Sequence, residues 1–112
     1  MQGTIERGVY GTATDILTLA DNVKAVIYQD TAVVKFTDEY IVLTAPDNAK
    51  TQTTKLRMNQ ASYQWGLGYY VAKKNGKWAV HHSRIVDGKM KPGRRICDFT
   101  CQNVRLSRSD LI

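Results

Sequence analysis

Residues 68–82 read GYYVAKKNGKWAVHH, two runs of strand-forming residues joined by Asn75-Gly76. Asn-Gly between two such runs is the strongest short-range signal for a β-hairpin, because both turn residues need a positive φ. A loop of these two residues fixes the pairing, from Lys74 opposite Lys77 back to Tyr69 opposite His82. Side-chain alternation then predicts one face made of the following residues: Tyr69, Val71, Lys73, Trp78, Val80 and His82.

The chain after this hairpin predicts further β-structure. A second turn signal, Asp87-Gly88, would return residues 89–91 along residues 84–86. We expect Pro92-Gly93 to stop that strand, residues 94–99 to form a last strand, and residues 105–112 to fray.

The chain before the hairpin predicts an antiparallel meander. Residues 23–28, 32–37 and 40–45 are short runs rich in β-branched and aromatic residues, separated by turns at 29–31 and 38–39. An earlier strand is expected within residues 8–19.

Residues 51–65 predict the chain's one helix. Thr51 is a candidate N-cap, good helix formers follow it, and Gly66 or Gly68 would end the helix. At 100° per residue, one helix face carries Met58, Ala61 and Trp65, and the opposite side carries Leu56 and Tyr63.

Length and composition are those of a single domain, residues 1–112. The chain has 43% apolar residues, enough for a modest core, and no apolar run that approaches a membrane span. Its start has no apolar signal core, and two cysteines are too few for a disulfide scaffold. We therefore expect an α+β fold, an antiparallel sheet of about five to seven strands in meander and hairpins with one central helix.

Charge is divided unequally along the chain. Residues 1–50 carry a net charge of −3 and residues 51–112 a net charge of +9, which together give the formal +6 of the whole chain. A basic half is the usual footprint of a protein that binds a polyanion, although a solvated face that maintains solubility would look the same.

The candidate polyanion-binding residues lie mostly on the predicted hairpins. Exposed cations there can track a phosphate backbone, and Tyr69 or Tyr70 could stack on a base, although not both on the same side. Trp78 is expected in the core. The candidate cations on the hairpins are Lys73, Lys74, Lys77, Arg84, Lys89, Lys91, Arg94 and Arg95.

The start of the helix is a second candidate anion site. Thr53 and Thr54 would present hydroxyls beside free backbone N–H groups, with Lys55 and Arg57 following. Simple capping by threonine is the alternative, and Arg57 and Asn59 could instead tie the helix to the sheet by hydrogen bonds.

Neither a metal site nor catalysis is predicted. Cys97 and Cys101 lack the spacing of a zinc knuckle, and His81 and His82 would point to opposite faces of a strand. On a strand the two cysteines would lie roughly 13 Å apart, so we expect two reduced thiols. No cofactor motif is present, since Gly66-x-Gly68 lacks a third glycine and a following helix.

Residues 51–59, read as T-x-T-T-K-x-R-M-N, resemble a signature in small, mostly uncharacterised proteins of tailed bacteriophages. The likeness extends over residues 31–82, with a Val/Val/Lys/aromatic strand before the signature and Gly-Tyr-x-Val and Gly-x-Trp-x-Val strands after it. A Gly/Trp-rich segment usually precedes the signature in those proteins, whereas residues 47–50 here read DNAK. The resemblance implies a phage origin and the cytoplasm of a bacterial host, and it brings no catalytic residues.

These observations predict a non-enzymatic protein that binds a polyanion, above all DNA or RNA, during phage infection. The alternative is an inhibitor of a host defence or other host enzyme, which would bind an acidic protein surface or sequester a nucleotide signal. A virion component is a third possibility. We expect no membrane partner, and a nucleotide-binding pocket could lie at a homodimer interface.

Overall fold

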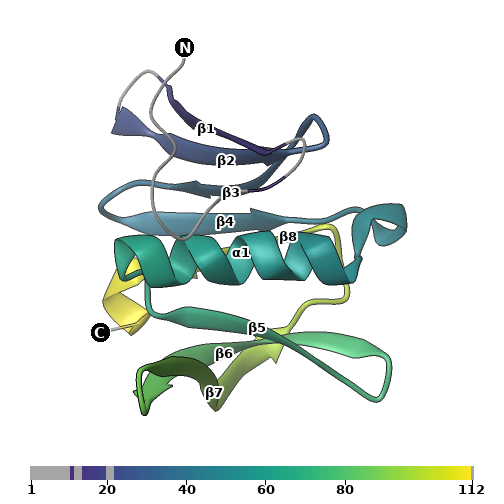
Figure 1. The fold of residues 1–112 in the computed structure, drawn as a ribbon, viewed down its shortest axis with the longest axis vertical. Coiled ribbons are helices and arrows are strands. Elements are labelled where there is room, and N and C mark those ends of the chain that lie inside the picture. Colours follow the sequence, from purple (N-terminus) through teal and green to yellow (C-terminus); the bar gives the residue numbers. More distant parts are fainter. Residues whose placement is uncertain (1–10, 12–13, 20–21, 112) are drawn as a thin grey trace.

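The computed structural model of the chain describes residues 11, 14–19 and 22–111. The described residues form eight strands, one α-helix and short 3-10 helices, which confirms the predicted α+β class (Figure 1). The elements in chain order are β1 (Thr14–Thr18), β2 (Lys24–Tyr28), β3 (Thr31–Phe36), β4 (Tyr40–Thr44), η2 (Asp47–Ala49), α1 (Gln52–Trp65), β5 (Tyr69–Lys74), β6 (Lys77–Val86), β7 (Lys89–Asp98), β8 (Asn103–Ser107) and η3 (Arg108–Leu111).

The first sheet is antiparallel and has the strand order β1-β2-β3-β4-β8. Its β2–β3–β4 part is the predicted meander, and β1 is the strand expected within residues 8–19, of which 8–10, 12 and 13 lie outside the described residues. The chain start, where we expect no secretion signal, also lies outside them.

Strand β8 corrects the expectation that residues 105–112 fray. It pairs with β4 from Thr44 opposite Asn103 to Tyr40 opposite Ser107. Val104 and Leu106 are buried while their neighbours are exposed, so this alternating segment completes the first sheet. Ile112 lies outside the described residues.

The second sheet has the order β5-β6-β7, and its first hairpin has the predicted register, from Lys74 opposite Lys77 to Tyr69 opposite His82. Asn75 and Gly76 have φ values of 54° and 78°, as the two-residue turn requires. The sequence predicted a single sheet, whereas the structure divides the strands between two sheets.

Strand β7 also corrects a prediction, because it continues through Pro92-Gly93 to Asp98. A proline has no N–H to donate to a neighbouring strand, which matters little here because β7 is an edge strand. Ser83 lies opposite Pro92, and the register shifts on both sides of His81 absorb the irregularity. Residues 94–98 are therefore the second half of one long strand, and Phe99, the last residue of the predicted strand, lies just beyond it.

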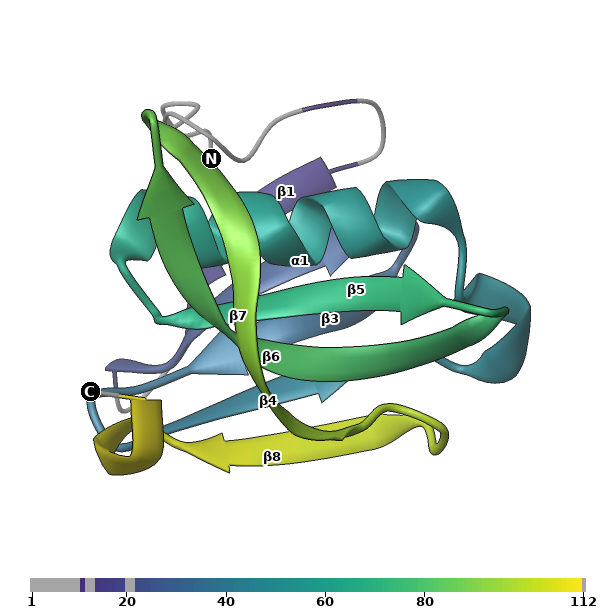
Figure 2. The same ribbon diagram turned by 90° about the horizontal axis from the view of Figure 1, so that it is seen from below.

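Strands β6 and β7 extend beyond the end of β5. Each has ten residues against six in β5, and Ser83 N–H donates to the Gly68 carbonyl where β5 begins. Past that point the described strands offer no third partner, so β6 and β7 pair with each other and curve toward α1 (Figure 2). We call residues 83–91 the β6–β7 arm.

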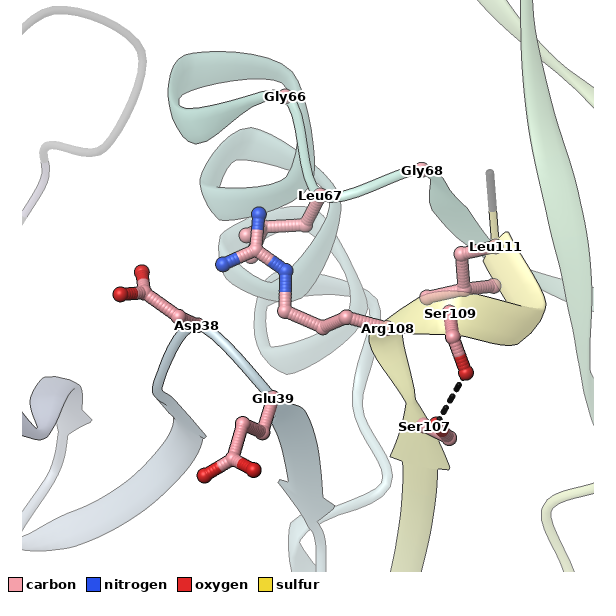
Figure 3. Close-up of a pocket in the computed structure, with 9 residues that line it drawn as sticks. All are labelled: Asp38, Glu39, Gly66, Leu67, Gly68, Ser107, Arg108, Ser109 and Leu111. Carbon is pink, nitrogen blue, oxygen red and sulfur yellow. Dashed lines mark hydrogen bonds between the residues drawn. The ribbon is translucent and has the colours of Figure 1, made fainter.

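The helix begins and ends as its sequence predicts. The Thr51 side chain accepts a hydrogen bond from the Thr54 N–H, and Gly66 ends the helix at φ 60°. That left-handed conformation suits glycine, and the chain then turns through Leu67 to Gly68 and β5 (Figure 3). No helix in the described ranges is long and apolar enough to cross a membrane.

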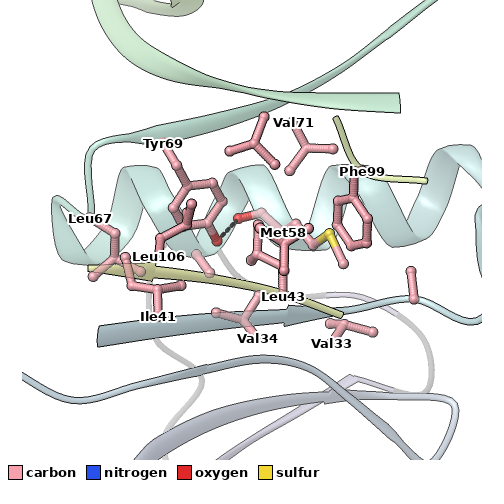
Figure 4. Close-up of a cluster of buried hydrophobic side chains, with 14 of the residues drawn as sticks. Val33, Val34, Ile41, Leu43, Met58, Leu67, Tyr69, Val71, Phe99 and Leu106 are labelled. Carbon is pink, nitrogen blue, oxygen red and sulfur yellow. Dashed lines mark hydrogen bonds between the residues drawn. The ribbon is translucent and has the colours of Figure 1, made fainter. Parts of the chain in front are cut away.

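The hydrophobic core fills the space between the first sheet, α1 and the second sheet (Figure 4). Ile41 and Leu43 come from the first sheet, Met58 from the helix, and Tyr69 and Val71 from the second sheet, and all five are fully buried. The buried helix face is thus the predicted Met58 face, so the opposite face is left to solvent.

Side chains of α1 also bond the free edge of β5. The Asn59 amide donates to the Val71 carbonyl at 2.9 Å and accepts from the Val71 N–H at 2.8 Å. The Ser62 hydroxyl does the same for Tyr69, at 2.6 and 3.1 Å. The helix therefore occupies the place of a fourth strand beside β5 and holds the second sheet in position.

Candidate functional site

The net charge of the chain resides in the second sheet. Residues 69–98 contain eight basic and two acidic residues, a net charge of +6 that equals the charge of the whole chain. All eight basic residues are exposed: Lys73, Lys74, Lys77, Arg84, Lys89, Lys91, Arg94 and Arg95. The structure thus places every predicted hairpin cation on the surface of one sheet.

Two cross-strand pairs in this sheet bring like charges directly opposite each other. Lys74 faces Lys77 at the β5–β6 turn, and Arg84 faces Lys91 on the β6–β7 arm. Directly opposed like charges destabilise a sheet, so an anion bound between them would relieve an unfavourable interaction.

Acidic partners for these cations are scarce. Asp98 forms an ion pair with Arg95, and no other member of the eight has such a pair within the described ranges. Arg94 instead lies 3.4 Å from the His82 ring nitrogen Nε2. Most of the cationic surface is therefore free for an external anion.

A groove lies between the outward face of α1 and the β6–β7 arm. It has a volume of about 370 Å³ and receives side chains from α1, β5 and β7. Lys55, Tyr70 and Lys89, three predicted site residues from three elements, all line it. We call this space the α1–arm groove.

The sequence did not mark the other members of this groove as site residues. Leu56 and Tyr63 line it from the helix and are 47% and 58% exposed, and Met90 lines it from the arm. The sequence did hold one signal for this groove, because Leu56 and Tyr63 lie seven positions apart on the helix side opposite Met58, which faces the core. Exposed apolar side chains in a groove rimmed by lysines are suited to a ligand with both flat apolar and anionic parts.

Tyr69, a predicted site residue, belongs to the core, which removes it from the candidate surface, whereas Trp78 lies in the core as expected. Tyr69 is fully buried, its hydroxyl donates to the Met58 carbonyl at 2.6 Å, and burial raises the pKa of its phenol well above the ordinary value. Trp78 is 5% exposed and packs edge-on against Phe99, with ring centroids 5.7 Å apart. Tyr70, which is partly exposed, is the member of the Tyr69-Tyr70 pair that remains able to stack on a ligand.

The helix start has a mainly structural role. Thr54 and Arg57 are 1% and 8% exposed. The Arg57 guanidinium donates from Nε to the Thr14 hydroxyl at 2.9 Å and lies over the Tyr28 ring. The structure confirms the alternative that the sequence left open, because Arg57 and Asn59 tie the helix to the sheets by hydrogen bonds.

Of the residues predicted to bind an anion at the helix start, which are Thr53, Thr54, Lys55 and Arg57, Lys55 lines the groove. Thr53 is partly exposed and does not line it. The two buried residues, Thr54 and Arg57, are not included in the candidate surface.

A smaller hollow of about 240 Å³ lies beside the β5–β6 turn, bordered by Lys73 and Lys77. Lys50 also borders it, but its ammonium already donates to the Ala45 and Cys101 carbonyls, at 2.7 and 3.0 Å. Asp47, which pairs with Lys50 at 3.4 Å, borders the hollow too, so an acidic residue meets the cationic surface at this end of the sheet.

A further pocket, of about 620 Å³, lies at the other end of the fold between the β3–β4 turn, the end of α1 and η3 (Figure 3). Arg108 donates to the Thr37 carbonyl there at 2.8 Å. The Asp38 and Glu39 carboxylates point away from the hydrogen-bonded hydroxyls of Ser107 and Ser109 (Figure 3). These groups do not make a base–nucleophile pair.

The histidines and cysteines do not gather into a ligand set. Within the described ranges no three His, Cys, Asp or Glu residues group as metal ligands would. His81 Nδ1 lies 2.9 Å from the Gly93 carbonyl oxygen. Cys97 and Cys101 are free thiols, and burial raises the pKa of Cys97 from its ordinary value.

Comparisons of this chain with protein-family models, with curated proteins and with solved structures found no match.

Proposed function

We propose that this protein binds nucleic acid without catalysis, through the exposed face of its second sheet and the adjoining α1–arm groove. The observation that carries the proposal is that like charges stand opposite each other at two places in the strand register, Lys74 opposite Lys77 and Arg84 opposite Lys91. A phosphate backbone supplies anions at regular spacing along such a surface, and each neutralised phosphate releases counterions.

The setting is part of the same proposal. The T-x-T-T-K-x-R-M-N signature at residues 51–59 supports a tailed-phage protein that acts in the cytoplasm of a bacterial host. A small basic protein made during infection would find nucleic acid abundant there.

The experiment is fluorescence anisotropy with labelled single-stranded and duplex oligonucleotides at 50 and 200 mM salt. The second sheet has eight exposed cations, so about six phosphate contacts are available. Six contacts predict a loss of affinity of about a thousandfold over that range of salt. Lack of binding at 50 mM salt would remove nucleic acid from the candidate ligands.

A double charge reversal locates the surface. Arg84→Glu with Lys91→Glu should weaken binding at least about tenfold and lower the salt slope by about 2, because two phosphate contacts are removed. The matched control is Lys35→Glu with Arg105→Glu, which changes the net charge equally on the first sheet. Equal losses in the two double variants would show that only net charge matters and would refute this surface.

A second candidate function is inhibition of a host defence protein or other host enzyme. The observation that favours it lies at the tip of the arm, where Ile85 and Val86 are 57% and 40% exposed among cations. Such a tip suits an acidic protein surface with an apolar centre. Capture of one host protein that survives nuclease treatment and is lost in Ile85→Asp would favour this function.

A further inference from the structure

We infer that the α1–arm groove holds one unpaired base, so that the protein prefers single-stranded nucleic acid to duplex. The inference rests on the proposed function and names the form of nucleic acid that the same surface recognises. It comes from the way the groove combines aromatic rings, lysines and an amide.

Two tyrosines border the groove from different elements. Tyr63 comes from the solvent face of α1 and is 58% exposed, while Tyr70 comes from β5 and is partly exposed. Exposed rings on a cationic surface are the usual stacking platforms for bases, and they tolerate different sequences because every base has a flat π-face.

The size of the groove limits the ligand. Its volume of about 370 Å³ is near the lower end of small-molecule sites, which suits one nucleotide and not a base pair. Met90 adds an apolar wall from the arm. A base within a duplex is covered on both faces by its neighbours, so only an unpaired base can enter and stack.

The charged and polar groups are placed for the rest of the nucleotide. Lys55 lines the groove from the helix and Lys89 from the arm, so cations on two elements can meet the flanking phosphates. Gln52 is exposed at the start of the helix and lines the same groove, where its amide can bond a base edge. Among the residues that the structure describes, none of those lining the groove is acidic, so none of them repels the backbone.

The groove adjoins the strip of cations. Lys89 lines it and lies on the arm that carries Arg84 and Lys91. A strand whose phosphates follow the arm would therefore bring a base to the two tyrosines.

The test uses an oligonucleotide with a single 2-aminopurine, whose fluorescence falls when the base stacks on an aromatic ring. Wild type should quench the single strand and bind it at least about tenfold more tightly than the duplex of the same sequence. Tyr63→Leu should lose most of the quenching and about tenfold in single-strand affinity, with duplex binding unchanged. Tyr63→Phe should retain both, because the ring is kept.

Tyr40→Leu is the matched control, because Tyr40 lies on the first sheet, stacked under Arg105 at 4.2 Å. It should leave quenching and strand preference as in wild type. If wild type binds both forms equally and Tyr63→Leu changes nothing, the inference fails while the proposed function stands, and an apolar protein segment becomes the better occupant. If wild type binds neither form at 50 mM salt, both proposals fail together.

Discussion

Replacing Asn59 with alanine should destabilise the protein by about 2 kcal/mol. The Asn59 amide makes two hydrogen bonds to the Val71 backbone, at 2.9 and 2.8 Å, in a partly buried position. Each such bond contributes about 1 kcal/mol. The unpaired Val71 N–H and carbonyl add a penalty of at most about 1 kcal/mol, because water can reach this partly buried position and replace the lost partner. Alanine returns about 0.5 kcal/mol as the better helix former.

The isosteric change Asn59→Asp gives a sharper form of this prediction. The second carboxylate oxygen that Asn59→Asp introduces would face the Val71 carbonyl oxygen, to which the Asn59 amide now donates. The ionised carboxylate has no proton to donate, so the two oxygens repel each other. The protonated form can donate, which raises the pKa of the new carboxyl in the folded state above its unfolded value of about 3.9. The loss of stability relative to wild type should therefore be larger at pH 7 than at pH 4. Asn48→Asp, at an exposed position in η2, is the control and should show little pH dependence.

Urea denaturation at both pH values measures these differences, because the midpoint moves with stability when the slope is unchanged. Hydrogen exchange of the Val71 amide supplies a local readout, since its N–H is released in Asn59→Ala. The reasoning is refuted if Asn59→Ala lies within about 0.5 kcal/mol of wild type and Val71 exchange is unchanged. In that case α1 would not be holding the edge of β5 through this side chain.

Three further predictions concern single groups. Tyr69→Phe should cost about 1 kcal/mol at pH 7 through the lost bond to the Met58 carbonyl. Burial raises the pKa of Tyr69 in the folded state, so wild type should lose stability above pH about 10, where the phenol ionises in the unfolded chain. The difference in unfolding free energy between wild type and Tyr69→Phe should therefore shrink above that pH, and a constant difference up to pH 11 would contradict this. Cys101 should react with iodoacetamide at pH 8 well before Cys97, which is partly buried and has a raised pKa, and mass spectrometry of each cysteine peptide would expose the opposite order. Gly66→Ala should cost about 1 kcal/mol by thermal unfolding, because φ is 60° there. Apart from the adjoining chain, no described atom lies within 4 Å of the Cβ that alanine would add, so the cost is one of backbone conformation and not of a clash. A neutral result would mean that the helix end rearranges.

The local features of this fold were predictable because short-range chemistry decides them. Asn75-Gly76 set the hairpin register, and Thr51 and Gly66 set the helix ends. Strand β8 could not be read in the same way, since its partner β4 is distant in the sequence and no turn joins them. The path of β7 through Pro92 depended on its being an edge strand, which only the completed sheet reveals.

The candidate site divides along the same line. Exposure of the hairpin cations follows from their charge, so composition alone predicted it. Alternation placed Tyr69 and Tyr70 on opposite faces without saying which face is buried, because the residues around both are apolar or aromatic. The groove was not predictable, since it needs the arm to curve toward α1 (Figure 2). Only then do Lys55 and Lys89 line the same space.

The signature at residues 51–59 mainly describes how α1 is attached. Thr51 caps the helix, Arg57 and Met58 are buried, and Asn59 bonds the edge of β5. Arg57, Met58 and Asn59 contact the sheets, so a protein that shares them is expected to share the attachment of the helix whatever its ligand.

In the proposed function, the ligand is recognised by other positions of the same helix. Gln52, Lys55, Leu56 and Tyr63 turn toward the groove from the same helix. Substitution of these four residues should change binding and leave unfolding nearly unchanged, whereas substitution of Asn59 should change unfolding first. Asn59 borders the groove as well as bonding β5, so the proposed binding role is tested at these four positions, which lack a bond to the sheet edge among the described contacts, and not at Asn59.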